Sequence, residues 1–88
     1  MKIQMIGSHL CQDTLYAMMK LKDQGVKIEF SNISTSFPAL KEFLNIREND
    51  PMYRTVKARG ELGIPLFILG DGTRTLSLEE VLERKSPV

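Results

Sequence analysis

The chain has 88 residues, a formal net charge of +1 and a single cysteine. This length suits one domain with a modest core, which we expect to span residues 1–88. The near-zero charge gives no reason to expect a nucleic-acid partner. No apolar run approaches the roughly 20 residues that cross a bilayer, and the N-terminus does not read as a signal peptide. We therefore expect a cytoplasmic protein, monomeric and without a membrane partner.

The first third of the chain predicts a strand, a helix and a second strand. Residues 2–6 form the first strand, with Ile3 and Met5 on one face and Ile6 toward the other. A helix then runs to about Gln24 and ends at Gly25. This helix is indicated by the spacing of Leu15, Met18, Met19 and Lys22. Residues 26–30 alternate as the second strand, parallel to the first.

Two helices are expected in the middle of the chain. Ser36 precedes the first, Pro38 lies in its first turn, and its core stripe is Leu40, Phe43, Leu44 and Ile46. Asp50 caps the second, which begins at Pro51 and ends at Gly60. Its inward side chains are Met52, Tyr53 and Val56. We also assign Phe37, Phe43, Met18 and Met19 to the core.

The last third predicts a hairpin and a final helix. Residues 65–69 form a strand buried on both faces, and residues 73–76 return beside it after the turn at residues 70–72. Ser77 and Glu80 form a capping box for a helix that frays through residues 85–87. Its inward side chains are Leu78, Val81 and Leu82. The order β-α-β-α-α-β-β-α predicts an α/β fold with a four-stranded mixed sheet and helices on both faces.

The single cysteine, Cys11, lies where the first helix should begin. Free backbone N–H groups and the helix dipole favour an anion there, and the thiolate is the reactive form of cysteine. Thr14, one turn later, could donate its hydroxyl to the sulfur, and His9 would help to hold the thiolate if protonated. Asp13 should point to solvent. In the alternative interpretation, Cys11 is a small buried hydrophobic residue without function.

Metal binding is not expected. Cys11 and His9 are the only Cys and His residues in the sequence, and these two ligands do not make a tetrahedral zinc site.

Ile64-Pro65 opens the predicted buried strand. The proline could simply start the strand, which is a tolerated position. It could instead follow a cis peptide bond, leaving the backbone of Ile64 free to pair with an extended peptide beside Cys11.

Together, these features resemble the glutaredoxins over nearly the whole chain. Cys11-Gln12-Asp13-Thr14 stands at the family's Cys-x-x-Cys or Cys-x-x-Ser motif, Gly63-Ile64-Pro65 at its cis-proline loop, and Gly70-Asp71-Gly72 at its hairpin turn. The resemblance implies a thioredoxin-like fold and a thiol–disulfide oxidoreductase of cell redox homeostasis. Thr14 replaces the second cysteine, so only a monothiol route is open.

The resemblance also implies glutathione as co-substrate, and glutathione or glutathionylated protein thiols as partners. Cys11 would attack the mixed disulfide, and Ile64 and Pro65 would hold the cysteinyl part of glutathione, with His9 nearby. Ser77 and Leu78, at the start of the last helix, would receive the γ-glutamyl carboxylate. Leu76 and the missing acid depart from the family's Gly-Gly and Asp at that turn. The Cys-Gly-Phe-Ser motif of cluster-binding monothiol members is absent as well.

Two interpretations stay open at the sequence level. Lys41, Arg47 and Arg54 include a possible partner for the glycyl carboxylate, or they form a solvated helix face. The whole chain could also be a non-catalytic thioredoxin-fold module that binds a peptide or glutathione beside Ile64-Pro65, with Cys11 incidental.

Overall fold

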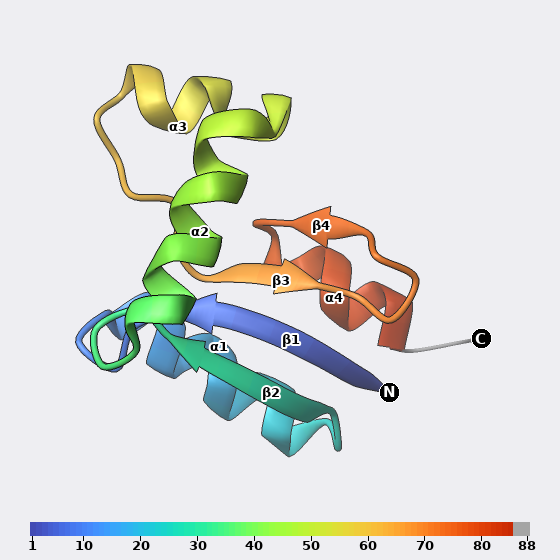
Figure 1. Cartoon of the computed structure of the whole chain (residues 1–88). Coiled ribbons are helices and arrows are strands. Elements are labelled where there is room, and N and C mark those ends of the chain that lie inside the picture. The colour runs from blue at the N-terminus through green and yellow to red at the C-terminus, as the bar shows by residue number, and fades with distance from the viewer. Residues whose placement is uncertain (86–88) are drawn as a thin grey trace.

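A four-stranded mixed sheet forms the centre of the protein in the computed structural model, which describes residues 1–85 (Figure 1). The strands are β1 (Lys2–Gly7), β2 (Lys27–Asn32), β3 (Leu66–Ile68) and β4 (Arg74–Thr75), in the order β2-β1-β3-β4. β1 and β2 are parallel, and β3 is antiparallel to both β1 and β4. The predicted strand directions are therefore confirmed, although β4 has two residues where four were expected.

Helices cover both faces of this sheet. They are α1 (Gln12–Asp23), α2 (Phe37–Asn49), the 3₁₀ helix η1 (Pro51–Tyr53), α3 (Arg54–Ala58) and α4 (Leu78–Lys85). Residues of α1 and α4 pack with Ile3, Met5 and Phe67 in one cluster. Residues of α2 and η1 pack with Ile6 and Leu66 in a second cluster on the opposite face. The expected fraying at residues 86–87 lies outside the described residues.

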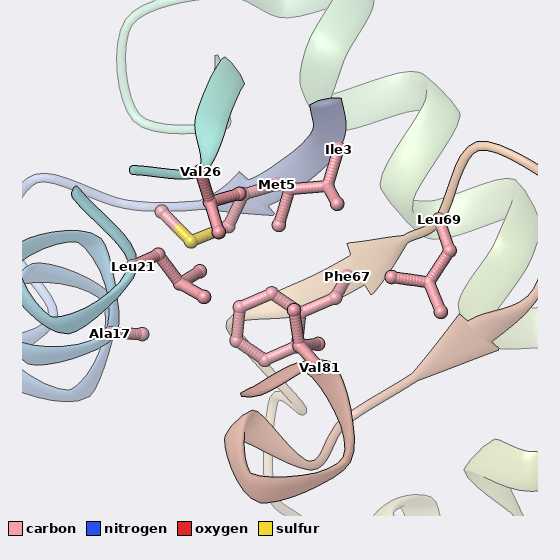
Figure 2. Packing of buried hydrophobic residues seen from close by; sticks show 8 residues of the cluster. All are labelled: Ile3, Met5, Ala17, Leu21, Val26, Phe67, Leu69 and Val81. Carbon is pink, nitrogen blue, oxygen red and sulfur yellow. The ribbon is translucent and has the colours of Figure 1, made fainter. Parts of the chain in front are cut away.

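Alternating side chains of β1 and β3 divide between these two clusters. Met5 and Phe67 are paired across the strands and belong to the first cluster, whereas Ile6 and Leu66 are paired and belong to the second. Figure 2 shows the Phe67 ring lying between Leu21 of α1 and Val81 of α4. This two-sided burial matches the prediction that residues 65–69 form a strand covered on both faces.

The predicted buried face of α1 is wrong. Leu15 and Met19 are 47% and 53% exposed, whereas Thr14, Ala17 and Leu21 are buried against the sheet. Thr14 packs against Gly7 of β1, and Ala17 and Leu21 belong to the first cluster. The spacing of large apolar residues along the helix does not indicate these contacts. The core assignment of Met18 holds in part, since it packs partly buried against the first cluster.

The predicted stripe of α2 is also partly wrong. Phe43 and Ile46 are buried, but Leu44 is exposed and Ala39 takes the inward position beside them. Phe37, which was assigned to the core, is 73% exposed. It is the first residue of α2, at the end of the helix that lies beyond the second cluster.

Side-chain caps begin the helices much as predicted. The Ser36 hydroxyl accepts from the Ala39 N–H at 3.2 Å, and Asp50 accepts from the Met52 N–H at 3.0 Å. Gly25 and Gly60 follow α1 and α3 with φ of 75° and 70°, a left-handed backbone that glycine adopts without strain. These signals are local, so the sequence reports them directly.

The capping box before α4 is confirmed only on one side. The Ser77 hydroxyl accepts from the Glu80 N–H at 3.1 Å, as predicted. The Ser77 N–H, however, donates to the Thr75 hydroxyl, which in turn donates to the Glu80 carboxylate, both at 3.0 Å. Thr75 therefore links the Ser77 N–H to the Glu80 carboxylate, which would bond directly in a complete capping box.

None of the helices described between residues 1 and 85 combines the length and the apolarity that a membrane span requires.

Candidate functional site

Cys11 is the N-cap residue of α1. Its N–H donates to the Ser8 carbonyl at 3.0 Å, and its own carbonyl accepts from the Leu15 N–H at 3.1 Å. The residue is half-buried, and its thiol is free. The sulfur therefore lies at a helix N-terminus, as predicted, where the helix dipole and free amides favour negative charge.

A cavity of about 430 Å³ opens beside Cys11. Its other side is formed by the loop between α3 and β3, at Glu61, Leu62, Gly63 and Ile64. The structure thus brings Cys11 and Ile64 together, although 53 positions separate them in the sequence. Asp13 is exposed to solvent, as expected, and it also lines this cavity.

A second cavity, of about 370 Å³, shares Asp13 and Ile64 with the first. It continues past Pro65 and Phe67 toward the start of α4. Its remaining lining residues are Tyr16, Ala17, Leu76, Leu78 and Glu79. The two cavities thus adjoin at Asp13 and Ile64, and we call them together the Cys11 groove.

The structure places the two α4 candidates differently. Leu78 lines the groove, whereas Ser77 lines a separate hollow with Met52, Arg74, Thr75 and Leu76. The Ser77 hydroxyl and N–H are both used in the cap described above. Ser77 is therefore a structural residue of the α4 start, and Leu78 and Glu79 are the α4 residues that line the groove.

The Ile64–Pro65 peptide bond is cis, so the simpler interpretation of Pro65 as a strand starter is wrong. Pairing between β1 and β3 ends at Leu66, two residues after Ile64. Among the hydrogen bonds of residues 1–85, none uses the N–H or C=O of Ile64. These groups lie at the groove and are available to a ligand.

Thr14 has a different contact from the one expected. It is fully buried, and its hydroxyl accepts from the Ser8 N–H at 3.4 Å. Within residues 1–85 no hydrogen bond joins this hydroxyl to the Cys11 sulfur. Thr14 also packs against Gly7, where an added Cβ would lie 2.6 Å from its hydroxyl oxygen. It therefore holds the turn that carries Cys11, instead of contacting the thiol.

His9 points away from the groove. Its Nδ1 lies 2.9 Å from the Asn32 amide nitrogen, and it does not line either cavity. The Asn32 amide oxygen accepts from the Ser34 N–H at 3.0 Å, which leaves the amide nitrogen to donate to His9. A ring that accepts at Nδ1 carries its proton on Nε2. His9 is therefore not among the residues that line the two cavities beside Cys11 and Ile64.

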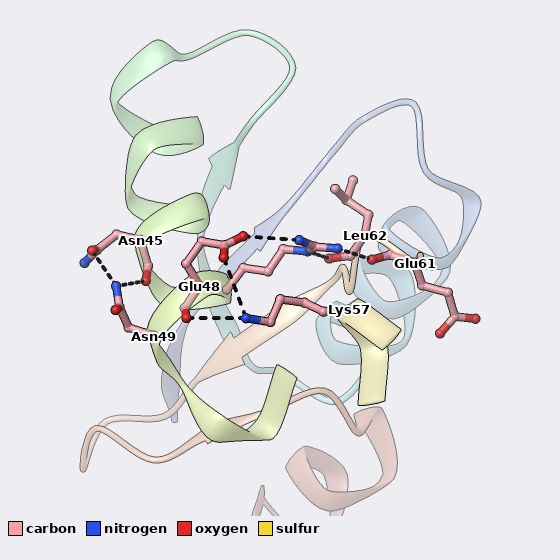
Figure 3. A network of polar contacts seen from close by, with 7 residues as sticks. Asn45, Glu48, Asn49, Lys57, Glu61 and Leu62 are labelled. Atoms are coloured by element: carbon pink, nitrogen blue, oxygen red, sulfur yellow. Dashed lines mark hydrogen bonds and ion pairs between the residues drawn. The ribbon is translucent and has the colours of Figure 1, made fainter. Parts of the chain in front are cut away.

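The loop on the far side of the cavity is held from α2 and η1. Arg47 donates to the Leu62 carbonyl at 3.0 Å and to the Glu61 carbonyl at 2.6 Å (Figure 3). The Tyr53 hydroxyl donates to the Gly63 carbonyl at 2.8 Å. Arg47 is thus engaged by this loop and is neither a free ligand for a carboxylate nor a solvated residue, because its side chain is only 17% exposed.

Tyr53 and Gly63 fit closely together. An added Cβ on Gly63 would lie 2.4 Å from the Tyr53 ring, and the φ of 88° at this position favours glycine. Burial raises the pKa of the Tyr53 hydroxyl to about 12, so the group stays a hydrogen-bond donor over the physiological range. Sequence reasoning missed the site roles of Arg47 and Tyr53, since no local pattern links them to residues 61–63.

Carboxylates set the charge of the groove. Asp13, Glu61 and Glu79 line it, and none of its lining residues is a lysine or arginine. Within the described range 1–85, no group of three His, Cys, Asp or Glu side chains is arranged to bind a metal ion. The groove therefore offers a thiol, free backbone groups, apolar walls and an acidic rim.

A protein of Haemophilus influenzae (strain ATCC 51907 / DSM 11121 / KW20 / Rd), with the name "Uncharacterized protein", is 35% identical to this chain over 71 residues. The match covers 81% of this chain and 83% of that protein. The chain belongs to the same family. No model of a known protein family and no solved structure matches it.

Proposed function

We propose that this protein has a thioredoxin fold and is a glutaredoxin-like, monothiol thiol–disulfide oxidoreductase that uses glutathione. The observation that carries the proposal is the juxtaposition of the Cys11 thiol, at the N-terminus of α1, with the unpaired backbone of Ile64 across one groove. The strand order β2-β1-β3-β4, with helices on both faces, supports the same proposal. We further propose that the protein acts in the cytoplasm as a monomer.

In the first step, the Cys11 thiolate attacks the glutathione sulfur of a mixed disulfide. A new S–S bond forms between Cys11 and glutathione, the old S–S bond breaks, and its electron pair leaves with the substrate thiolate. In the second step, the thiolate of another glutathione attacks the glutathione sulfur of this mixed disulfide. Oxidised glutathione is released and the Cys11 thiolate is restored, so electrons balance without a second protein cysteine.

Ile64 and Pro65 supply the recognition in this scheme. The free N–H and C=O of Ile64 pair with the backbone of the cysteinyl residue of glutathione, and Pro65 forms the wall beside it. The start of α4 at Leu78 bounds the far end of the groove. Thr14 supports the chemistry indirectly, because its contact with Ser8 holds the turn that carries Cys11.

The acidic rim favours a second candidate function. Glutathione carries a net negative charge at neutral pH, whereas Asp13, Glu61 and Glu79 favour cations. A non-catalytic thioredoxin-fold module that binds an extended basic peptide along Ile64-Pro65 would use the same groove with Cys11 incidental. The two candidates differ in whether the thiol is needed.

Cys11→Ser separates these candidates. We expect the wild type to reduce a glutathionylated peptide in the presence of reduced glutathione, and the variant to lose this turnover to the uncatalysed rate. Urea unfolding midpoints within error of each other would show that the variant is folded. A wild type without turnover that binds a basic peptide as well as the Cys11→Ser variant does would contradict the oxidoreductase and support the binding module.

A further inference from the structure

The loop that faces Cys11 has three successive carbonyls, and all three are taken by side chains of the α2–η1 region. Arg47 donates to those of Glu61 and Leu62, and Tyr53 donates to that of Gly63. The loop is otherwise tied to the α3 end by one bond, from the Glu61 N–H to the Val56 carbonyl at 3.0 Å. The conformation of the loop therefore depends on two side chains that lie elsewhere in the sequence.

These contacts determine which backbone groups face Cys11. In a trans peptide unit, the C=O and the following N–H point in opposite directions. Carbonyls turned toward Arg47 and Tyr53 therefore leave the N–H groups of Leu62, Gly63 and Ile64 directed away from the helices. These three residues line the cavity beside Cys11, which is where a ligand would meet this segment.

Arg47 suits this task chemically. Its planar guanidinium donates through Nε and Nη2 to two neighbouring carbonyls at once, which a lysine ammonium cannot match in geometry. Its third contact, from Nη1 to the Glu48 carboxylate at 3.6 Å, orients the group from the same helix (Figure 3). The low exposure of the side chain strengthens these charged hydrogen bonds relative to a solvated pair.

We infer that Arg47 is a positioning residue for the exchange reaction: it holds Glu61–Ile64 so that this segment can pair with the disulfide substrate beside Cys11. The inference rests on the proposed function, because its test measures the rate at which Cys11 forms a mixed disulfide with glutathione. Arg47 itself does not touch the reacting sulfur atoms. Its loss should therefore weaken pairing with glutathione and leave the intrinsic reactivity of Cys11 unchanged.

The test compares Arg47→Met with Lys57→Met. Lys57 belongs to the same polar network, through the carbonyl and the carboxylate of Glu48, but has no hydrogen bond to residues 61–63 (Figure 3). Two rates are measured at Cys11: formation of the mixed disulfide with oxidised glutathione, and alkylation by iodoacetamide, which needs no pairing with the loop. Backbone order parameters of Leu62 and Gly63 are measured by NMR in the same samples.

We expect Arg47→Met to slow mixed-disulfide formation by roughly tenfold to a hundredfold, the loss that a misplaced positioning group causes. Alkylation should stay within about twofold of the wild type, while the order parameters fall from about 0.85 toward 0.6. Lys57→Met should change none of the three. Arg47→Lys should recover part of the rate, since one ammonium can hold one of the two carbonyls.

Three results would overturn the inference. They are an equal fall in both rates, unchanged order parameters in Arg47→Met, and an equal effect of Lys57→Met. If the wild type forms no mixed disulfide, the proposed function fails, and the order parameters alone decide whether Arg47 positions the loop. The two failures are therefore distinguishable.

Discussion

The two segments that flank the Cys11 groove are held in opposite ways. The turn from Ser8 to Cys11 is fixed mainly by its own sequence neighbours, through the Ser8–Cys11 and Ser8–Thr14 hydrogen bonds and a bond from the Leu10 N–H to the Ser8 hydroxyl at 3.0 Å. Two contacts leave this region, one between the hydroxyls of Ser8 and Ser34 and one from the Asn32 amide to the His9 ring. The segment Glu61–Ile64 is instead fixed by Arg47 and Tyr53, which precede it by 14 and 10 residues.

This difference indicates which substitutions should disturb each of the two segments. The conformation of the turn from Ser8 to Cys11 should depend mainly on residues within one helical turn of Cys11. The conformation of the segment Glu61–Ile64 should depend on α2 and η1, because side chains of these helices bind its carbonyls. Substitutions of Gly63, Gly7 and Tyr53, each of which lies in one of the two segments or contacts it, test this contrast.

The largest effect is expected for Gly63→Ala. The added Cβ would lie 2.4 Å from Tyr53 and 2.9 Å from Val56, and φ is 88°. Left-handed strain and overpacking together should lower the free energy of unfolding by about 2–5 kcal/mol, measured by urea denaturation. Gly60→Ala is the control, with φ of 70° and no atom within 4 Å, and should cost only about 1–2 kcal/mol. Equal losses would show that the close fit to Tyr53 is unimportant.

A smaller effect is expected for Gly7→Ala, at the end of β1 directly before the turn that carries Cys11. Its Cβ would approach the Thr14 side chain to 2.6 Å, but its φ is not in the left-handed region. Overpacking a buried contact of this kind costs about 1–3 kcal/mol, again read from urea denaturation. Gly70→Ala, whose nearest neighbour would be 3.9 Å away, should be nearly neutral. A neutral Gly7→Ala would contradict the close packing of Thr14 on β1.

The smallest effect is expected for Tyr53→Phe, which removes only the hydroxyl that binds the Gly63 carbonyl. The loss should be about 1 kcal/mol at neutral pH. Because the pKa of Tyr53 is raised to about 12 in the folded protein, its stabilising effect is complete below pH 10 and lost as pH rises toward 12. Unfolding measured from pH 9 to 12 should therefore show a shallower decline in Tyr53→Phe. A parallel decline in both proteins would rule out a contribution from this hydroxyl.

The contrast between the two segments also explains what the sequence could predict. Strand directions, the caps at Ser36 and Asp50, and the position of Cys11 at a helix start are local signals, and all are confirmed. The buried face of α1 was predicted wrongly, because Thr14, which packs against Gly7 of β1, lies on that face together with Ala17 and Leu21.

Long-range contacts account for the remaining differences at the site. Arg47 read as a surface cation, and only the folded chain shows that it binds the carbonyls of Glu61 and Leu62. His9 was expected beside the sulfur because it is two residues away, but Asn32 of β2 holds its ring elsewhere. No local sequence pattern predicts either contact, because each joins residues that lie far apart in the chain.

The central claim is that Cys11 exchanges disulfides with glutathione in this groove. It is tested most directly by mass spectrometry of the protein after incubation with oxidised glutathione at neutral pH. We predict one glutathione per chain, mapped to Cys11 and removed by reduced glutathione. An unmodified Cys11, under conditions in which free cysteine forms the mixed disulfide, would contradict the claim.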